Sequence, residues 1–237
     1  MREARHLQEE FSLLRGKLLE MAGVAEELLR AAVEALVERD IEKAKSVIRG
    51  DRELDAMELE LDDLCINILA LHQPVARDLR FITMAMRISN DLERVGDHSV
   101  NIAHQARDLA GMPGFGRSAE LEEMARVSGE MLSDALDSFV RSDAGSAREV
   151  CRRDDVVDAL EDTLFRVLLT HMMEDPRRIG SGIALILTAR NFERVADLAT
   201  NIAEDVVFLV EGRSIKHGAR KGEATEDHPA ENGDKSP

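Results

Sequence analysis

The chain has 237 residues, of which 44% are apolar and 33% are charged, a composition typical of a folded, soluble protein with one domain or two small ones. Aromatic residues make up only 3% and Trp and Tyr are absent, which argues against base-stacking surfaces and aromatic-lined ligand pockets. The formal net charge of −16 argues against binding to nucleic acid and against unaided adsorption to anionic lipid. Cations and proteins with basic surfaces are the expected partners.

The sequence also predicts a cellular location. The N-terminus lacks the apolar segment of a signal peptide, and no run approaches the roughly 20 apolar residues of a membrane span. The two cysteines, Cys65 and Cys151, lie within helical patterns and are expected to be small buried hydrophobic residues in a reducing compartment. We therefore expect a cytoplasmic protein.

Three helices are predicted in the first half of the chain. Apolar residues alternate at steps of four and three from Leu7 onward, which predicts a helix over residues 3–38. Asp40 is a good N-cap for a second helix, which runs to about Leu71. Pro74 ends that helix, and a third is expected over residues 76–110.

The second half repeats this plan. Residues 111–117 contain three Gly and one Pro and predict a loop between the repeats. Helices are expected over 118–142, from the N-cap Asp143 to about 173, and from between 177 and 183 to about 211, with Pro176 at the second corner.

No stretch alternates with the period of a strand. The predicted fold class is all-α, with two tandem three-helix antiparallel bundles. The predicted segments are a first repeat over 1–110, a linker over 111–117, a second repeat over 118–212, and a polar tail over 213–237 that is expected to be disordered.

A repeated acidic motif lies in the third helix of each half. The segment Glu93-Arg-Val-Gly-Asp97 recurs one hundred residues later as Glu193-Arg-Val-Ala-Asp197. Acids four residues apart project from one face of a helix. A single pair of this kind is usually a solvated face, and this alternative remains open for all of them.

The preceding helix of each half carries a second acidic pair that is level with the first. Asp55 and Glu93 each lie 19 residues from Pro74, and Asp51 and Asp97 each lie 23 residues from it. Because neighbouring helices lie about 8–10 Å apart, inward-pointing carboxylates of the two helices could converge. Around Pro176 the corresponding acids are level to within one residue.

Two groups of four carboxylates result. The first acidic site consists of Asp51, Asp55, Glu93 and Asp97, and the second acidic site consists of Asp154, Asp158, Glu193 and Asp197. Four clustered carboxylates repel one another unless they are protonated or bridged by cations, and such oxygen ligands suit Mg²⁺, Mn²⁺ or iron, while Zn²⁺ also accepts them. Two other interpretations stay open: a carboxylate-bridged di-metal oxidase or metal store, and a metal-free helical scaffold. The former uses Glu-x-x-His ligand pairs, which neither repeated helix contains.

Several segments resemble the PhoU family of bacterial phosphate-transport accessory and regulatory proteins. The resemblance spans about residues 5–213 and rests on both acidic motifs, on Gln73-Pro-Val-Ala-Arg-Asp-Leu-Arg80, and on Met172-Met-Glu-Asp-Pro176. It implies two three-helix bundles, each with a multinuclear iron or zinc cluster held by the acidic site defined above. Ala196 departs from the family pattern, where Gly is usual, but it replaces no ligand.

The resemblance also implies a role in which no reaction is catalysed. Members of the family connect the phosphate ABC transporter, through its ATPase subunit, to the sensor histidine kinase, and keep the phosphate-starvation response off. The protein would then be a homodimer peripheral to the membrane through these protein partners, without inserting into the membrane.

Overall fold

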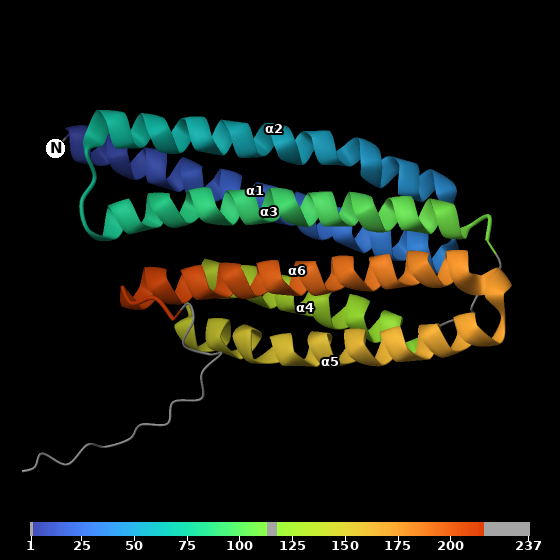
Figure 1. The fold of residues 1–237 in the computed structure, drawn as a ribbon. Helices are drawn as coiled ribbons and strands as arrows, with labels where there is room; N and C mark the ends of the chain where they lie inside the picture. The colour runs from blue at the N-terminus through green and yellow to red at the C-terminus, as the bar shows by residue number, and fades with distance from the viewer. Residues whose placement is uncertain (1, 113–117, 216–237) are drawn as a thin grey trace, which may run out of the picture.

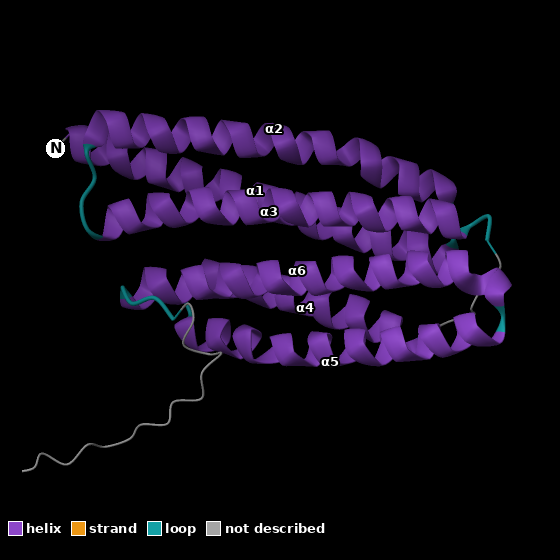
Figure 2. Cartoon of the chain, in the orientation of Figure 1, coloured by secondary structure: helices purple, strands orange, loops and turns teal. Residues whose placement is uncertain are grey.

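The computed structural model describes residues 2–112 and 118–215, and these residues are almost entirely helical (Figures 1 and 2). The elements in chain order are α1 (Arg2–Glu38), α2 (Ile41–His72), α3 (Arg77–Leu109), α4 (Ala119–Arg141), α5 (Ala144–Glu174), a short 3₁₀ helix (Pro176–Arg178) and α6 (Ile179–Glu211). No strand occurs in this described part of the chain. The predicted all-α fold class is confirmed, and the helix limits agree with the predicted ones within a few residues.

Two of the predicted segments lie mostly outside the described residues. These are the greater part of the predicted linker, residues 113–117, and the predicted disordered tail from residue 216 onward. The division of the chain into two repeats, a linker and a tail therefore stays a prediction. None of the described helices is both long and apolar enough to cross a membrane.

The predicted helix starts are fixed by aspartate caps. Asp40 accepts hydrogen bonds from the backbone N–H groups of Glu42 and Lys43, at 2.9 and 3.0 Å. Asp143 caps α5 in the same way, accepting from Gly145 at 2.9 Å and from Ser146 at 3.2 Å. Each cap satisfies backbone donors that have no partner inside the helix.

The two proline corners differ in form. Before Pro74, Gln73 ends α2 in the left-handed conformation with a φ of 46°, and α3 starts at Arg77. At Pro176 the chain instead enters a 3₁₀ turn that leads directly into α6. Both corners reverse the chain, so that α2 and α3, like α5 and α6, run antiparallel (Figure 1).

Helices α3 and α6 form the centre of the molecule. Helix α3 packs against α1, α2 and α6, and α6 packs against α4, α5 and α3. Figure 1 shows α2, α3, α6 and α5 one below another, with α1 and α4 behind them. Each acidic site therefore lies along the line where a central helix packs against an outer helix, and we use the word groove for this line.

Polar and aromatic contacts join the two bundles across this centre. The Arg87 guanidinium of α3 lies 3.2 Å from the buried Asp205 carboxylate of α6. The rings of Phe81 on α3 and Phe139 on α4 are stacked with centroids 6.3 Å apart, and the guanidinium of Arg15 lies over both. These contacts join α1 and α3 of the first bundle to α4 and α6 of the second.

The cysteines agree with the prediction of buried hydrophobic residues. Cys65 is fully buried and Cys151 is half-buried, and both are free thiols. Burial raises the pKa of the Cys65 thiol to about 12 and that of Cys151 to about 11. Neither thiol is therefore activated as a nucleophile.

Candidate functional site

The first acidic site lies in the groove between α2 and α3. The pKa of the Glu93 carboxyl is raised to about 7, first by burial and then by the negative charges of Asp97, Glu58, Asp55 and Asp51. The negative charges of α2 thus act on the carboxyl of Glu93 on α3. The structure brings together the four residues that the spacing around Pro74 placed level with one another.

Asp51 reaches from α2 toward the backbone of α3. The pKa of its carboxyl is raised to about 6 by burial, then by the charges of Asp55 and Asp97. A Cβ atom at Gly96 would lie 2.7 Å from Asp51 Oδ1 and 2.5 Å from Leu54 Cδ2. The missing side chain of Gly96 therefore lets the α2 carboxylate reach the backbone of α3 between the two acids of the motif.

The second acidic site occupies the corresponding groove between α5 and α6. The pKa of the Glu193 carboxyl is raised to about 7 by burial, and then by Asp197, Glu161 and Asp158, while Arg194 lowers it. Thr200 Oγ1 on α6 donates a hydrogen bond of 3.4 Å to Asp154 Oδ1 on α5. All four predicted residues again line one groove.

A guanidinium lies within the second acidic site. Arg194 Nη1 is 2.9 Å from Asp197 Oδ2, and Arg194 Nε is 3.3 Å from Glu193 Oε2. Arg190 approaches Glu161 of the same groove at 3.9 Å. The chain thus supplies its own cations to the second site.

The arginine of the motif has a different partner in the first acidic site, where Asp91 stands in place of Asn191. Arg94 Nη1 pairs with Asp91 Oδ1 at 3.5 Å and so turns away from Glu93. Position 191 is Asn, which offers no charge to Arg194 and instead contacts His98 of α3 at 2.9 Å. The sequence repeat predicted two equivalent sites, whereas the structure gives them different internal partners.

The donor atoms of both sites are of the kind that hard cations prefer. Their donors are carboxylate oxygens, which suit Mg²⁺, Mn²⁺ or iron and are accepted by Zn²⁺. Gly96 leaves the space that close approach of α2 requires, and Arg194 occupies a position that favours positive charge. No three His, Cys, Asp or Glu side chains of the described ranges are already arranged as metal ligands. A bound cation would therefore have to draw these carboxylates inward.

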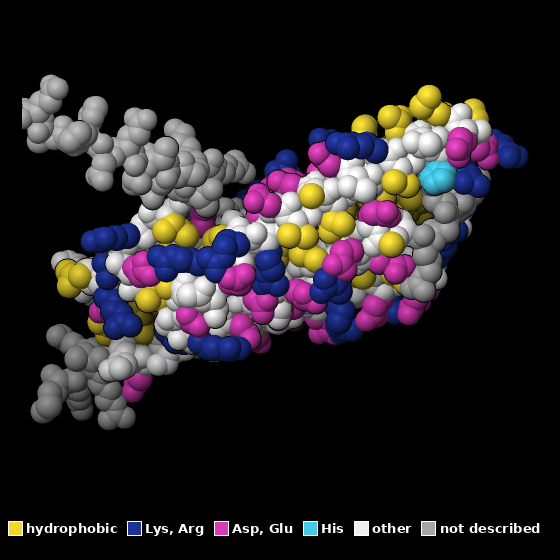
Figure 3. Space-filling model, turned by 90° about the horizontal axis from the view of Figure 1, so that it is seen from below, with side chains coloured by type: hydrophobic (Ala, Val, Ile, Leu, Met, Phe, Trp, Pro, Cys, Tyr) yellow, Lys and Arg dark blue, Asp and Glu magenta, His cyan; other side chains and the backbone are white. Residues whose placement is uncertain are grey.

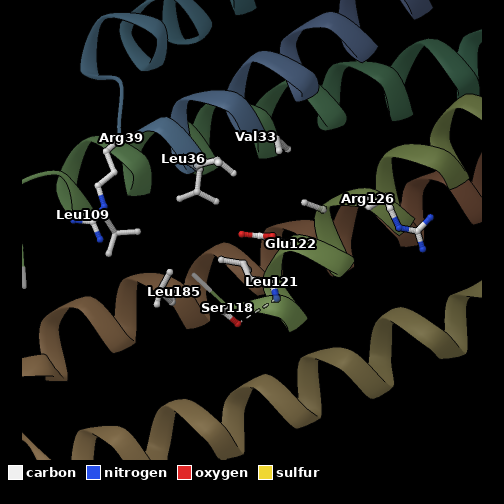
Figure 4. A pocket seen from close by; sticks show the side chains of 11 residues that line it. Val33, Leu36, Arg39, Leu109, Ser118, Leu121, Glu122, Arg126 and Leu185 are labelled. Carbon is white, nitrogen blue, oxygen red and sulfur yellow. Dashed lines mark hydrogen bonds between the residues drawn. The ribbon is translucent and has the colours of Figure 1, made fainter. Parts of the chain in front are cut away.

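Sequence reasoning did not anticipate an apolar cavity at the junction of the two bundles. It measures about 490 Å³ and lies among α1, α3, α4 and α6, with Leu36, Leu109, Leu121 and Leu185 among its walls (Figure 4). Its rim includes Ser118, the first described residue after 113–117. The cavity therefore belongs to the junction between the repeats and not to either acidic site.

A second, smaller cavity between α3 and α6 is polar. It measures about 250 Å³ and is lined by Arg87, Asn90, Asp91, Asn201 and Asp205. The predicted pattern of α3 and α6 gave no sign of it, because it forms only where the two bundles meet. It surrounds the Arg87–Asp205 ion pair described above.

Comparison with known proteins identifies one family across both halves of the chain. The family model described as "PhoU domain" matches twice, over residues 18–106 and 121–206. The phosphate-specific transport system accessory protein PhoU homolog of Zymomonas mobilis is 38% identical over 212 residues, covering 90% of each chain. The Escherichia coli K12 accessory protein PhoU is 34% identical over 208 residues, covering 88% of this chain and 86% of its own.

Two solved structures share the fold over most of their length. The crystal structure of PhoU from Pseudomonas aeruginosa is 38% identical, has a TM-score of 0.85 and covers 87% of this chain and 99% of its own. The regulatory protein PhoU from Streptococcus pneumoniae is 28% identical, with a TM-score of 0.80, and covers 88% of this chain and 98% of its own. Such proteins are accessory regulators and not enzymes, in agreement with the prediction that no reaction is catalysed. By its two matched domains and these relatives, the chain belongs to the PhoU family and has a role in the regulation of phosphate transport.

Proposed function

We propose that the protein is a metal-binding adaptor that represses the phosphate-starvation response and modulates phosphate uptake. In this role it connects the ATPase subunit of the phosphate ABC transporter with the sensor histidine kinase. The names of the relatives support the link to phosphate transport. The observation that carries the metal-binding part is that both repeats gather four carboxylates in the same groove, with a glutamate pKa near 7 in each.

The two acidic sites would hold the metal. Their eight ligands are Asp51, Asp55, Glu93, Asp97, Asp154, Asp158, Glu193 and Asp197. Iron or zinc is the metal that the family resemblance favours, and Mn or Mg also suits the oxygen ligands. When bound, the cation supplies the positive charge that crowded carboxylates otherwise obtain from protons.

The adaptor role depends on contacts with partner proteins. A net charge of −16 suits partners with basic surfaces better than an anionic lipid surface. We place the protein in the cytoplasm, at the membrane through its partners, and as a homodimer.

Elemental analysis of the purified protein tests the metal-binding part. We expect the wild type to carry metal after reconstitution and the double variant Asp97→Ala/Asp197→Ala to lose most of it. The control Asp63→Ala/Asp162→Ala removes two exposed acids from α2 and α5 outside the acidic sites, and should keep the metal. Equal, low metal in wild type and site variant would overturn this part and favour the metal-free scaffold.

Gene deletion tests the regulatory part. We expect phosphate-starvation genes to be expressed in phosphate-rich medium after deletion, and repression to return when the wild-type gene is supplied. Unchanged expression after deletion would contradict the regulatory role. This result is independent of the metal measurement, so the two parts can fail separately.

A further inference from the structure

Two histidines and a glutamate meet where the first turns of α1 lie beside the last turn of α2. His6 and Glu10 belong to α1, and His72 is the last residue of α2. In Figure 1 the beginning of α1, marked N, lies next to the end of α2 that leads into the corner at Pro74. We call His6, Glu10 and His72 the histidine cluster.

The carboxylate of Glu10 lies between the two imidazole rings. Glu10 Oε2 is 2.7 Å from His72 Nε2, and Glu10 Oε1 is 3.7 Å from His6 Nε2. The two rings meet edge to face, with their centroids 6.0 Å apart. In a tetrahedral zinc site with zinc about 2.0 Å from each donor atom, the donor atoms lie about 3.3 Å from one another. The two contacts of Glu10 bracket this separation.

The shorter of the two contacts is not a hydrogen bond. Glu10 Oε2 and His72 Nε2 are both shielded from solvent, and neither has a hydrogen-bond partner among the described residues. A nitrogen and an oxygen this close form a hydrogen bond only when the N–H group points at the oxygen. The two atoms therefore point past each other, as two ligands of one metal ion do. Buried polar atoms without a partner are rare in folded proteins, which makes the arrangement informative.

The positions along the chain suit zinc as well. His6 and Glu10 are four residues apart, so they project from one face of α1. Zinc sites commonly take two ligands at this spacing from one helix and a third from another element. Two imidazoles and one carboxylate, with water in the fourth position, are an established set of zinc ligands.

The surroundings of Glu10 differ from those of other surface acids. Figure 3 shows a face of the molecule on which Asp and Glu side chains are interspersed with Lys and Arg, and on which little histidine is seen. An acid of this surface is expected to face a basic side chain, as Glu27 and Glu34 face Arg30. Glu10 instead faces two of the seven histidines of the chain.

We propose that the histidine cluster binds one zinc ion through His6 Nε2, the Glu10 carboxylate and His72 Nε2, with water as the fourth ligand. The cluster is not yet arranged as a set of ligands in the described part of the chain. A turn of the exposed His6 ring toward Glu10 completes it, because Glu10 and His72 are already held in place by burial. The bound ion fastens the first turns of α1 to the end of α2.

The histidine cluster is separate from the acidic sites. His72 lies 17 residues beyond Asp55, about 25 Å along a helix. The second repeat has no such cluster among its described residues, because α4 has 23 residues against the 37 of α1 and Glu174 stands at the position before Pro176 that corresponds to His72. The proposal therefore does not depend on the metal-binding function proposed above.

Zinc titration of the full-length variant Asp97→Ala/Asp197→Ala, in competition with a chromophoric chelator, tests the proposal while the acidic sites contribute little. We expect this variant to bind one zinc ion per chain. Adding His72→Gln or Glu10→Gln should weaken that binding at least about tenfold, since loss of even an outer partner of a metal ligand commonly costs about 10–100-fold. The matched control His171→Gln removes a histidine near the end of α5 and should change it less than about twofold.

Thermal unfolding separates loss of zinc binding from loss of folding. Zinc should raise the unfolding temperature of the Asp97→Ala/Asp197→Ala variant but not after His72→Gln is added, while circular dichroism shows both to be folded without zinc. In otherwise wild-type protein, His72→Gln should remove one zinc ion per chain. Absence of zinc binding, or equal binding with and without His72→Gln, would overturn the proposal and leave an ion pair between Glu10 and His72. An equal loss with His171→Gln would also overturn it, and none of these results bears on the acidic sites.

Discussion

Replacing Glu93 by Gln should make the metal-free protein more stable at alkaline pH. The Glu93 carboxyl is half-buried, and its pKa is raised from 4.5 to about 7 by burial and by the neighbouring acids of the first acidic site. The folded state therefore binds this proton more tightly than the unfolded state. The resulting contribution to stability is fully present below pH 4.5 and is lost as the pH rises through about 7.

The size of this effect follows from the shift. A difference of about 2.5 pKa units corresponds to at most about 3.4 kcal/mol, at about 1.4 kcal/mol per unit. Because the carboxyl keeps contact with water, solvent screening reduces this to about 1–2 kcal/mol. A neutral amide of the same shape removes the cost of ionising Glu93 in the groove. The variant should therefore gain about 1–2 kcal/mol at pH 8 and almost nothing at pH 4.5.

Urea unfolding followed by circular dichroism, in the presence of a metal chelator, measures this gain at both pH values. Glu53→Gln removes the same charge from an exposed position of α2 and serves as the control. The difference in unfolding free energy between Glu93→Gln and wild type should change with pH, and that of the control should not. A pH-independent difference, or a Glu93→Gln variant that is less stable than wild type at pH 8, would refute the reasoning.

Three further changes test other contacts. Gly96→Ala should lower the free energy of unfolding, measured in urea, by about 1 kcal/mol, because overpacking against the buried Leu54 exceeds the gain in helix propensity. Gly129→Ala should raise it by about 0.5–1 kcal/mol, because a Cβ atom at Gly129 would have no neighbouring atom within 4 Å. Arg87→Ala should cost about 1–3 kcal/mol in the same assay, because its buried carboxylate partner on α6 loses a charged contact; an unchanged midpoint would contradict this. Arg194→Gln should strengthen metal binding at the second acidic site in a calorimetric titration, because a competing cation is removed, and unchanged affinity would show that the guanidinium does not compete.

Much of the fold could be predicted because local chemistry determines it. The caps Asp40 and Asp143 satisfy helix donors within three residues of chain, and Pro74 and Pro176 interrupt helices wherever they occur. Once two helices are joined by a short corner, counting residues from that corner gives their register. This is why the members of each acidic site could be paired from sequence before the grooves were seen.

The difference between the two acidic sites could not be predicted in this way. Arg94 and Arg194 occupy the same place in the repeat, so the motif alone gives no reason to expect different partners for them. Asp91 draws one guanidinium out of its groove, whereas Asn191 is engaged by His98 of the other bundle and leaves Arg194 among the carboxylates. That choice depends on a contact between residues 93 positions apart.

The sequence by itself determined the helices, their corners, the repeat and the eight acids, because each depends on neighbours along the chain or on one hairpin. Only the tertiary structure decided that α3 and α6 pack at the centre, that Arg87 meets a buried Asp205, and that Ile179, Ile183 and Leu187 of α6 stay exposed. Helical periodicity identifies which residues share a face, but packing decides which faces are covered. The same four-residue spacing therefore forms core in α3 and exposed surface at the end of α6.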